Sequence, residues 1–166
     1  MQTTTVLHST RIDLPAQSRQ PLVQLLNQQL ADAVDLYSQT KQAHWNVKGP
    51  QFFSLHQLFD KLAGELEGHI DSLAERATAL GGTARGTLRQ AAAVSRIPEY
   101  PAAARESREH LEALGERFAA YAASTRAAIR SATELGDAST ADLFTEISRD
   151  ADKGLWFLEA HLQTAA

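Results

Sequence analysis

Two histidines and three carboxylates lie within 32 positions of this chain, in a stretch whose hydrophobic pattern is otherwise helical: His44, His56, Asp60, Asp71 and Glu75. Imidazole and carboxylate together form the ligand set of iron, manganese or zinc rather than that of calcium. His56 and Asp60 are four residues apart, and so are Asp71 and Glu75, so each pair shares one face of a helix. The residue types and their spacing therefore predict a transition-metal site.

The two pairs cannot serve one metal ion within a single helix. Asp60 and Asp71 are eleven residues apart, which is roughly 16 Å along a helix. The midpoint of Asp60 and Asp71 is position 65.5, and His56 and Glu75 share that midpoint. An antiparallel two-fold crossing of two copies at this point would set Asp60 opposite the partner's Asp71, and His56 opposite the partner's Glu75, as isologous contacts require.

Two glycines support such a crossing. Gly64 and Gly68 flank position 65.5, and each costs about 1 kcal/mol relative to alanine in a helix interior. Close approach of a second backbone is a physical reason for their presence. The alternative is that the carboxylates form an ordinary solvated stripe and bind no metal. We infer two identical sites per dimer, each built from both chains.

The His/His/Asp/Asp/Glu pattern also carries a family resemblance. The chain resembles the Dps family of miniferritins (DNA-binding protein from starved cells) over about residues 20–162. The residues that carry it are segments 41–49, 74–76, 80–82, 148–150 and 155–157, with Phe52, His56, Asp60, Asp71, Asp152 and Lys153. The resemblance implies a four-helix subunit, a hollow dodecamer, and ferroxidase centres between two-fold-related subunits. His44, His56 and Asp60 would come from one subunit, and Asp71 and Glu75 from its mate.

The resemblance further implies iron chemistry at this site. Each centre would hold two iron ions, oxidise Fe(II) with hydrogen peroxide in preference to oxygen, and feed a ferric mineral core. Asp71 and Glu75 are expected to anchor the tighter iron. Trp45, which follows His44 directly, is interpreted either as a core or interface anchor or as an electron donor that absorbs stray oxidising equivalents, the role proposed in the family.

Asp137, Asp142 and Glu146 form a second acidic group, at the expected start of the fourth helix, and the last two share one face. A negative charge at the start of a helix interacts favourably with the helix dipole, and each such group stabilises the helix by about 0.3–1 kcal/mol. The resemblance offers another interpretation, in which this segment lines an acidic three-fold pore that admits Fe(II). A ring of carboxylates is a reasonable cation funnel, so both interpretations stay open.

Four amphipathic helices must position these residues. Pro21 suits the first turn of the first helix, and Ser54/Gln57 and Ser139/Asp142 have the spacing of helix caps. Hydrophobic residues at intervals of three and four predict helices from about Pro21 to Trp45, from about Ser54 to Leu80, over the stretch 111–132, and from about Ser139 to Leu162.

The segments outside these helices complete the organisation. Residues 1–19 are predicted to be a mobile polar tail, residues 20–162 the bundle, and residues 163–166 a short C-terminal tail. The connection 83–101 is long enough to let the second and third helices run parallel, and a short helix is expected within it near Leu88 to Val94. The expected fold is all-α: a ferritin-like four-helix bundle with a long crossover between helices two and three.

Composition limits the partners. Cysteine is absent, which excludes disulfides and thiolate metal sites. The net charge is −4, and residues 1–20 contain Arg11 and Arg19 but no lysine, so DNA binding is expected to be weak or absent and nucleoid association doubtful. No apolar run approaches the roughly 20 residues that span a membrane, and no signal-peptide pattern occurs, so a cytoplasmic location is expected.

The leading hypothesis is a dodecameric ferroxidase, an oxidoreductase that stores iron and detoxifies peroxide. One alternative is a cage that mainly binds and condenses DNA. Another is a bundle whose site holds zinc or manganese and performs no redox chemistry. The Glu-x-x-His spacing of bundles with an internal di-iron site and the His-Glu-x-x-His signature of zinc hydrolases are both absent from the sequence, which favours a site between subunits.

Overall fold

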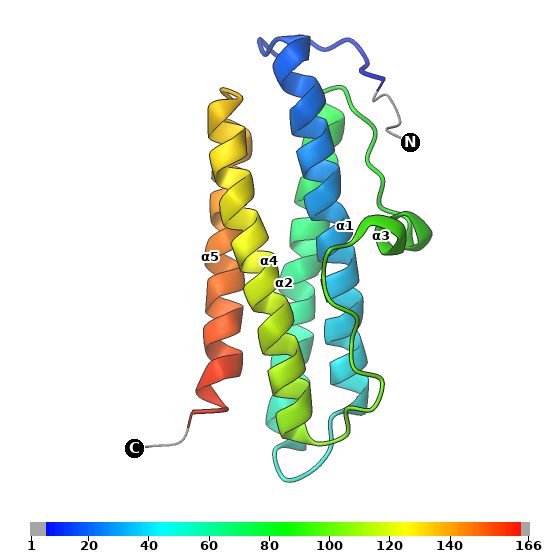
Figure 1. Ribbon diagram of the computed structural model, residues 1–166, viewed down its shortest axis with the longest axis vertical. Helices are drawn as coiled ribbons and strands as arrows, with labels where there is room; N and C mark the ends of the chain where they lie inside the picture. Colours follow the sequence, from blue (N-terminus) through cyan, green and yellow to red (C-terminus); the bar gives the residue numbers. More distant parts are fainter. Residues whose placement is uncertain (1–5, 164–166) are drawn as a thin grey trace.

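The computed structural model describes residues 6–163, and five helices account for most of this range (Figure 1). Within it no residue forms a strand, and no helix is long and apolar enough to cross a membrane. The all-α bundle with a short helix in its crossover is confirmed. The helices are α1 (Ala16–Asn46), α2 (Phe52–Ala79), α3 (Leu88–Val94), α4 (Ser107–Glu134) and α5 (Ala138–Ala160).

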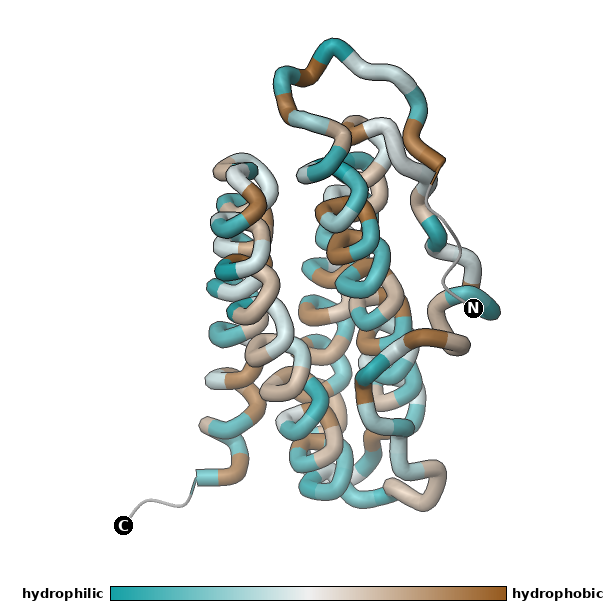
Figure 2. The backbone as a smooth tube through the Cα atoms, turned by 45° about the horizontal axis from the view of Figure 1, so that its top comes forward, coloured by the Kyte–Doolittle hydropathy of each residue, from teal (hydrophilic) through white to brown (hydrophobic). Residues whose placement is uncertain are grey.

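The four long helices lie side by side and bury one face each. α1 packs chiefly against α2, and α4 packs chiefly against α5. α2 and α4 run in the same direction because the crossover returns the chain to the opposite end of the bundle (Figure 1). Hydrophobic and hydrophilic residues alternate along each long helix (Figure 2), as amphipathic helices require. The core is rich in leucine, and its largest fully buried side chains are Phe59, Tyr121 and Phe144.

The first helix begins earlier than predicted. Residues 16–19 belong to α1 and not to a mobile tail, and Pro21 lies inside the helix rather than in its first turn. Pro21 is the sixth residue of α1, beyond the four N–H groups that have no partner within a helix, so it removes one backbone hydrogen bond, the one to the carbonyl of residue 17. The expected tail boundary at residue 19 was therefore wrong.

Residues 6–15 lie against the bundle. The His8 N–H donates to the Gly81 carbonyl at 2.7 Å, and the Arg19 guanidinium donates to the Leu80 carbonyl at 2.9 Å. Three apolar side chains within this polar stretch pack against the core, and they give it an ordered position that periodicity does not detect: Leu7, Ile12 and Leu14. The remainder of the two predicted tails, residues 1–5 and 164–166, lies outside the described residues.

Two helix starts also differ from prediction. α2 begins at Phe52, two residues before the expected Ser54 cap. α5 begins at Ala138 and is capped by Asp137, whose carboxylate accepts a hydrogen bond from the Thr140 N–H at 3.2 Å. Aspartate and serine are comparable caps, so spacing alone does not choose between neighbouring candidates.

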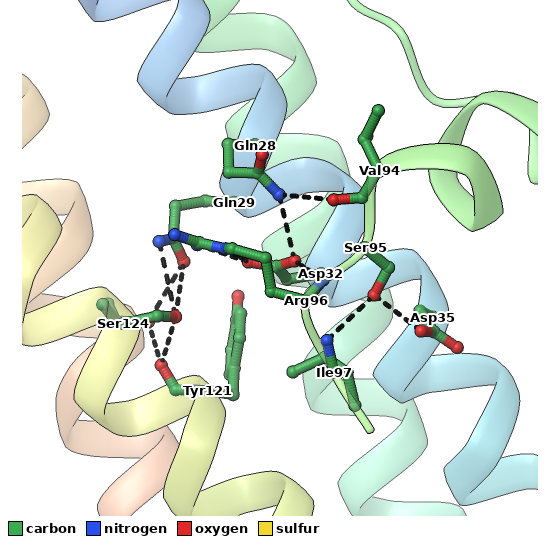
Figure 3. Close-up of polar contacts among 11 residues, drawn as sticks. Gln28, Gln29, Asp32, Asp35, Val94, Ser95, Arg96, Ile97, Tyr121 and Ser124 are labelled. Atoms are coloured by element: carbon green, nitrogen blue, oxygen red, sulfur yellow. Dashed lines mark hydrogen bonds and ion pairs between the residues drawn. The ribbon is translucent and has the colours of Figure 1, made fainter. Parts of the chain in front are cut away.

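A buried ion pair ties the crossover to α1 (Figure 3). Asp32 on α1 is fully buried. Arg96 in the crossover donates to it from Nε at 3.0 Å and from its backbone N–H at 2.9 Å. Gln28 donates to Asp32 at 3.2 Å and to the Val94 carbonyl at 2.9 Å. Because a buried carboxylate must be paired and hydrogen-bonded, these contacts fix the crossover against the helix that carries His44.

Candidate metal centre

His44 and His56 come together where α1 ends and α2 begins. A short loop joins the two helices, and Gly49 within it has a φ of 98°, a backbone conformation that favours glycine. The reversal of the chain brings the last turn of α1 against the first turns of α2. The two imidazole rings stack, with centroids 3.7 Å apart and an angle of 20° between their planes.

Reciprocal hydrogen bonds orient both rings. His44 Nδ1 lies 2.8 Å from the His56 carbonyl oxygen, and His56 Nδ1 lies 2.8 Å from the His44 carbonyl oxygen. A carbonyl oxygen only accepts, so each Nδ1 is the donor and carries a proton. In the neutral ring this leaves the lone pair of Nε2 available to a metal ion or a hydrogen-bond donor. Hydrogen bonding of the other ring nitrogen is the usual way in which proteins orient a metal-binding histidine.

Asp60 lies beside these imidazoles on α2. Its Oδ1 is 3.8 Å from His44 Nε2 and 2.7 Å from Lys41 Nζ. The hydrogen bond from Lys41 holds the pKa of the Asp60 carboxyl below its usual range, and it outweighs the opposing effect of burial. Asp60 is therefore an ionised carboxylate pointing toward a histidine nitrogen. Imidazole nitrogen and carboxylate oxygen are ligand types that suit a transition metal.

Asp71 and Glu75 lie further along α2 and are exposed. They share an exposed stripe of the helix with Asp60, Gly64 and Gly68. Apart from the adjacent residues and the backbone of α2 itself, no heavy atom of the described chain lies within 4 Å of a Cβ placed on either glycine. The fold of one chain therefore gives no packing reason for these glycines, whereas a second helix crossing there would.

Among residues 6–163, no group of three or more His, Asp or Glu side chains could hold a metal ion within one chain. The structure brings His44, His56 and Asp60 together, and it places Asp71 and Glu75 apart from them along α2. The pairing of these two halves across a two-fold axis stays a prediction.

Trp45 is 66% exposed, so it is not a core residue of the subunit. Its ring centroid lies 6.0 Å from Lys41 Nζ, a distance compatible with a cation–π contact. The interface-anchor and electron-donor interpretations both remain compatible with this position.

The three acidic residues near the start of α5 do not have equal surroundings. Asp142 and Glu146 are exposed. Asp137 is only 3% exposed, and both of its carboxylate oxygens accept from the Arg76 guanidinium, at 2.9 and 2.8 Å. The hydroxyl of Thr140 also donates to it. Asp137 therefore ties the end of α2 to the start of α5, and its charge is already neutralised.

The surroundings of Asp137 predict a pH-dependent contribution to stability. Burial tends to raise the pKa of Asp137, but the hydrogen bonds from Thr140 and Arg76 outweigh it and the pKa is lowered. A lowered carboxyl pKa contributes stability above the unfolded-state value, and this stability is lost as pH falls through the folded-state value. We expect Asp137→Asn, which keeps a capping oxygen, to lower the free energy of unfolding at pH 7 by about 2 kcal/mol.

Urea denaturation at pH 7 and at pH 3 measures this effect. The difference between wild type and Asp137→Asn should shrink as pH falls below about 4, near the unfolded-state pKa. The exposed Asp142→Asn is the matched control and should change stability by less than about 0.5 kcal/mol. An equal difference at both pH values would contradict the assignment of this stability to the ionised carboxylate.

Lys41 and Arg76 belong to segments that carry the family resemblance, but the sequence assigned neither of them a role. Lys41 is 19 residues from Asp60, and Arg76 is 61 residues from Asp137. A lysine or arginine on a helix normally indicates only a solvated face. The packing of α1 on α2 and of α2 against the start of α5 creates both contacts.

The bundle order and the histidine–carboxylate cluster between α1 and α2 define a ferritin-like protein. The family model for the ferritin-like domain matches residues 23–166. Within that class, the chain belongs to the Dps family. The DNA protection during starvation protein of Agrobacterium fabrum (strain C58 / ATCC 33970) is 46% identical over 156 residues, which are 94% of this chain and 96% of that protein.

Solved structures agree with this assignment. DpsC from Streptomyces coelicolor superposes with a TM-score of 0.92 at 33% identity, and the match covers 97% of this chain and 94% of that one. The Dps protein from Vibrio cholerae O1, described as a member of a broad superfamily of ferritin-like diiron-carboxylate proteins, has a TM-score of 0.87 at 28% identity. That match covers 95% of this chain and 99% of the other.

Proposed function

We propose that this protein is a ferroxidase and iron-storage protein. It oxidises Fe(II), preferentially with hydrogen peroxide, and sequesters Fe(III) as a mineral core inside a hollow dodecamer built from two-fold dimers. The observation that carries this proposal is the reciprocal pair of hydrogen bonds between His44 and His56, which leaves both Nε2 atoms as acceptors, that of His44 lying 3.8 Å from the ionised Asp60.

The chemistry of the donor atoms fits iron. Imidazole nitrogen and carboxylate oxygen suit iron, zinc and manganese, and the absence of cysteine leaves no soft thiolate ligand. Asp71 and Glu75 of one subunit would anchor the tighter of two iron ions. The imidazoles and Asp60 of the mate would orient that ion and help to hold the weaker one. Carboxylates attract Fe(III) more strongly than Fe(II) because the ion charge is larger, which favours oxidation.

The proposed reaction balances with two Fe(II) for each hydrogen peroxide. Each Fe(II) loses one electron, the O–O bond breaks, and two protons complete two water molecules. Delivery of both electrons at one centre avoids release of a hydroxyl radical. In this proposal the exposed Trp45, next to His44, donates an electron when only one Fe(II) is present.

Fe(II) would enter through acidic pores between subunits. Asp142 and Glu146 are the proposed pore residues, because both are exposed on α5 and their charge would concentrate cations. Asp137 would hold the pore segment in place through Arg76 rather than bind Fe(II) itself, because its carboxylate is already paired and only 3% exposed.

Anaerobic loading of wild-type protein with Fe(II), followed by hydrogen peroxide, tests this function. We expect ferric absorbance to appear faster than in protein-free solution, with about two Fe(II) consumed per peroxide, as paired-iron chemistry requires. Oxidation no faster than in buffer would contradict the proposal. With metal still bound, that result would favour the zinc or manganese alternative. Retardation of DNA on gels at physiological salt, together with slow oxidation, would favour the DNA-condensing cage.

A further inference from the structure

Lys41 places a cation on the carboxylate that is expected to bind metal. Its Nζ lies 2.7 Å from Asp60 Oδ1, the same oxygen that lies 3.8 Å from His44 Nε2. The Lys41 side chain is only 20% exposed, whereas that of Asp60 is 59% exposed. The ammonium therefore approaches Asp60 from the α1 side and leaves the other side of the carboxylate open to solvent.

Two contacts hold the ammonium in this position. Besides the Asp60 carboxylate, the Trp45 ring lies 6.0 Å from Lys41 Nζ, and an aromatic face attracts a cation at this distance. Lys41 and Trp45 are four residues apart on α1, so the helix itself sets their spacing. The lysine thus joins the helix that carries His44 to the carboxylate on α2.

We propose that Lys41 is a resident cation that controls the order in which the two metal positions of each centre fill. While the ammonium pairs with Asp60, this carboxylate offers an incoming ion less charge, and the ammonium repels that ion. A divalent ion therefore binds first at Asp71 and Glu75, and the position on Asp60 fills only when a second ion displaces the ammonium. This inference rests on the proposed function, and it makes Lys41 a positioning residue.

Lys41→Met tests this role because methionine keeps an unbranched stem and removes the charge. Anaerobic titration of the full-length protein with cobalt(II) chloride in a calorimeter measures both binding steps without oxidation of the metal. We expect two unequal steps in wild type, and in Lys41→Met a second step about fivefold tighter or more. Exposed ion pairs account for about twofold to fivefold, and loss of the repulsion adds to this.

Two further variants separate the specific contact from general charge. Lys48→Met removes one positive charge from the loop after α1, where the side chain is exposed, and it should leave both steps unchanged. Lys41→Arg retains the cation and should keep the second step weak. If circular dichroism shows that Lys41→Met does not fold, Lys41→Gln replaces it in the titration. A folded Lys41→Gln whose second cobalt step has the wild-type affinity would then overturn the inference.

The outcomes distinguish this inference from the proposed function. Two cobalt steps in wild type with an unchanged second step in Lys41→Met would overturn the role of Lys41 and leave the ferroxidase proposal standing. Equal tightening in Lys41→Met and Lys48→Met would overturn it as well, because the effect would then be one of net charge. Absence of any cobalt binding in wild type would overturn both proposals.

Discussion

Replacement of Asp71 and Glu75 by alanine together is expected to abolish rapid ferric formation, slowing it at least about a hundredfold. Loss of a residue that is only hydrogen-bonded to a metal ligand commonly lowers metal affinity or activity 10–100-fold. This double variant removes the proposed ligands themselves. The measurement is ferric absorbance after anaerobic Fe(II) loading and addition of peroxide. Equal rates in variant and wild type would show that these carboxylates are a solvated stripe.

The matched control removes two other carboxylates. Glu116 lies on α4, Glu159 lies near the end of α5, and both are exposed. Glu116→Ala/Glu159→Ala therefore changes the net charge by the same amount without altering α1 or α2, the helices that carry the proposed ligands. Its rate should remain within about twofold of wild type, because salt screens exposed charges that do not contact the site.

Mixing of two inactive variants tests whether each centre is shared between subunits. His56→Ala/Asp60→Ala and Asp71→Ala/Glu75→Ala should each be inactive alone. After dissociation and reassembly in equal amounts, about a quarter of the centres should recover, because half of the random dimers are mixed and each holds one intact centre of two. A site contained within one chain would recover nothing on mixing.

The second large effect concerns stability. Arg96→Met is expected to lower the free energy of unfolding by about 3 kcal/mol, because it leaves the fully buried Asp32 carboxylate without its counter-ion. Gln28 and the backbone N–H of residue 96 still donate to Asp32, which keeps the cost at the lower end for a buried pair. Chemical denaturation at fixed protein concentration measures this, because subunit association contributes to apparent stability.

Two variants check the explanation. Arg108→Met breaks an exposed pair with Glu112 on one face of α4 and should cost less than about 1 kcal/mol. Asp32→Asn combined with Arg96→Met removes the buried charge and should be less destabilised than Arg96→Met alone. If the double variant were the less stable of the two, loss of side-chain packing rather than an unpaired charge would explain the effect.

Hydrophobic patterning alone predicted the long helices and the short helix from Leu88 to Val94, and residue types alone suggested the proposed metal site. These features are local, because hydrophobic periodicity and i,i+4 spacing are properties of one helix. Helix starts were less well predicted. Several residues can cap a helix comparably, and the order of residues 6–15 depends on contacts with Leu80 and Gly81, which are remote in sequence.

The contacts that orient the candidate site residues come from the packing of one helix on another. The exchange of hydrogen bonds between His44 and His56, the pairing of Lys41 with Asp60, and the neutralisation of Asp137 join residues 12, 19 and 61 positions apart. Such contacts depend on how one helix packs against another, and charged side chains on isolated helices otherwise indicate only solvent exposure. The packing thus separated Asp137, which is structural, from Asp142 and Glu146, which remain exposed.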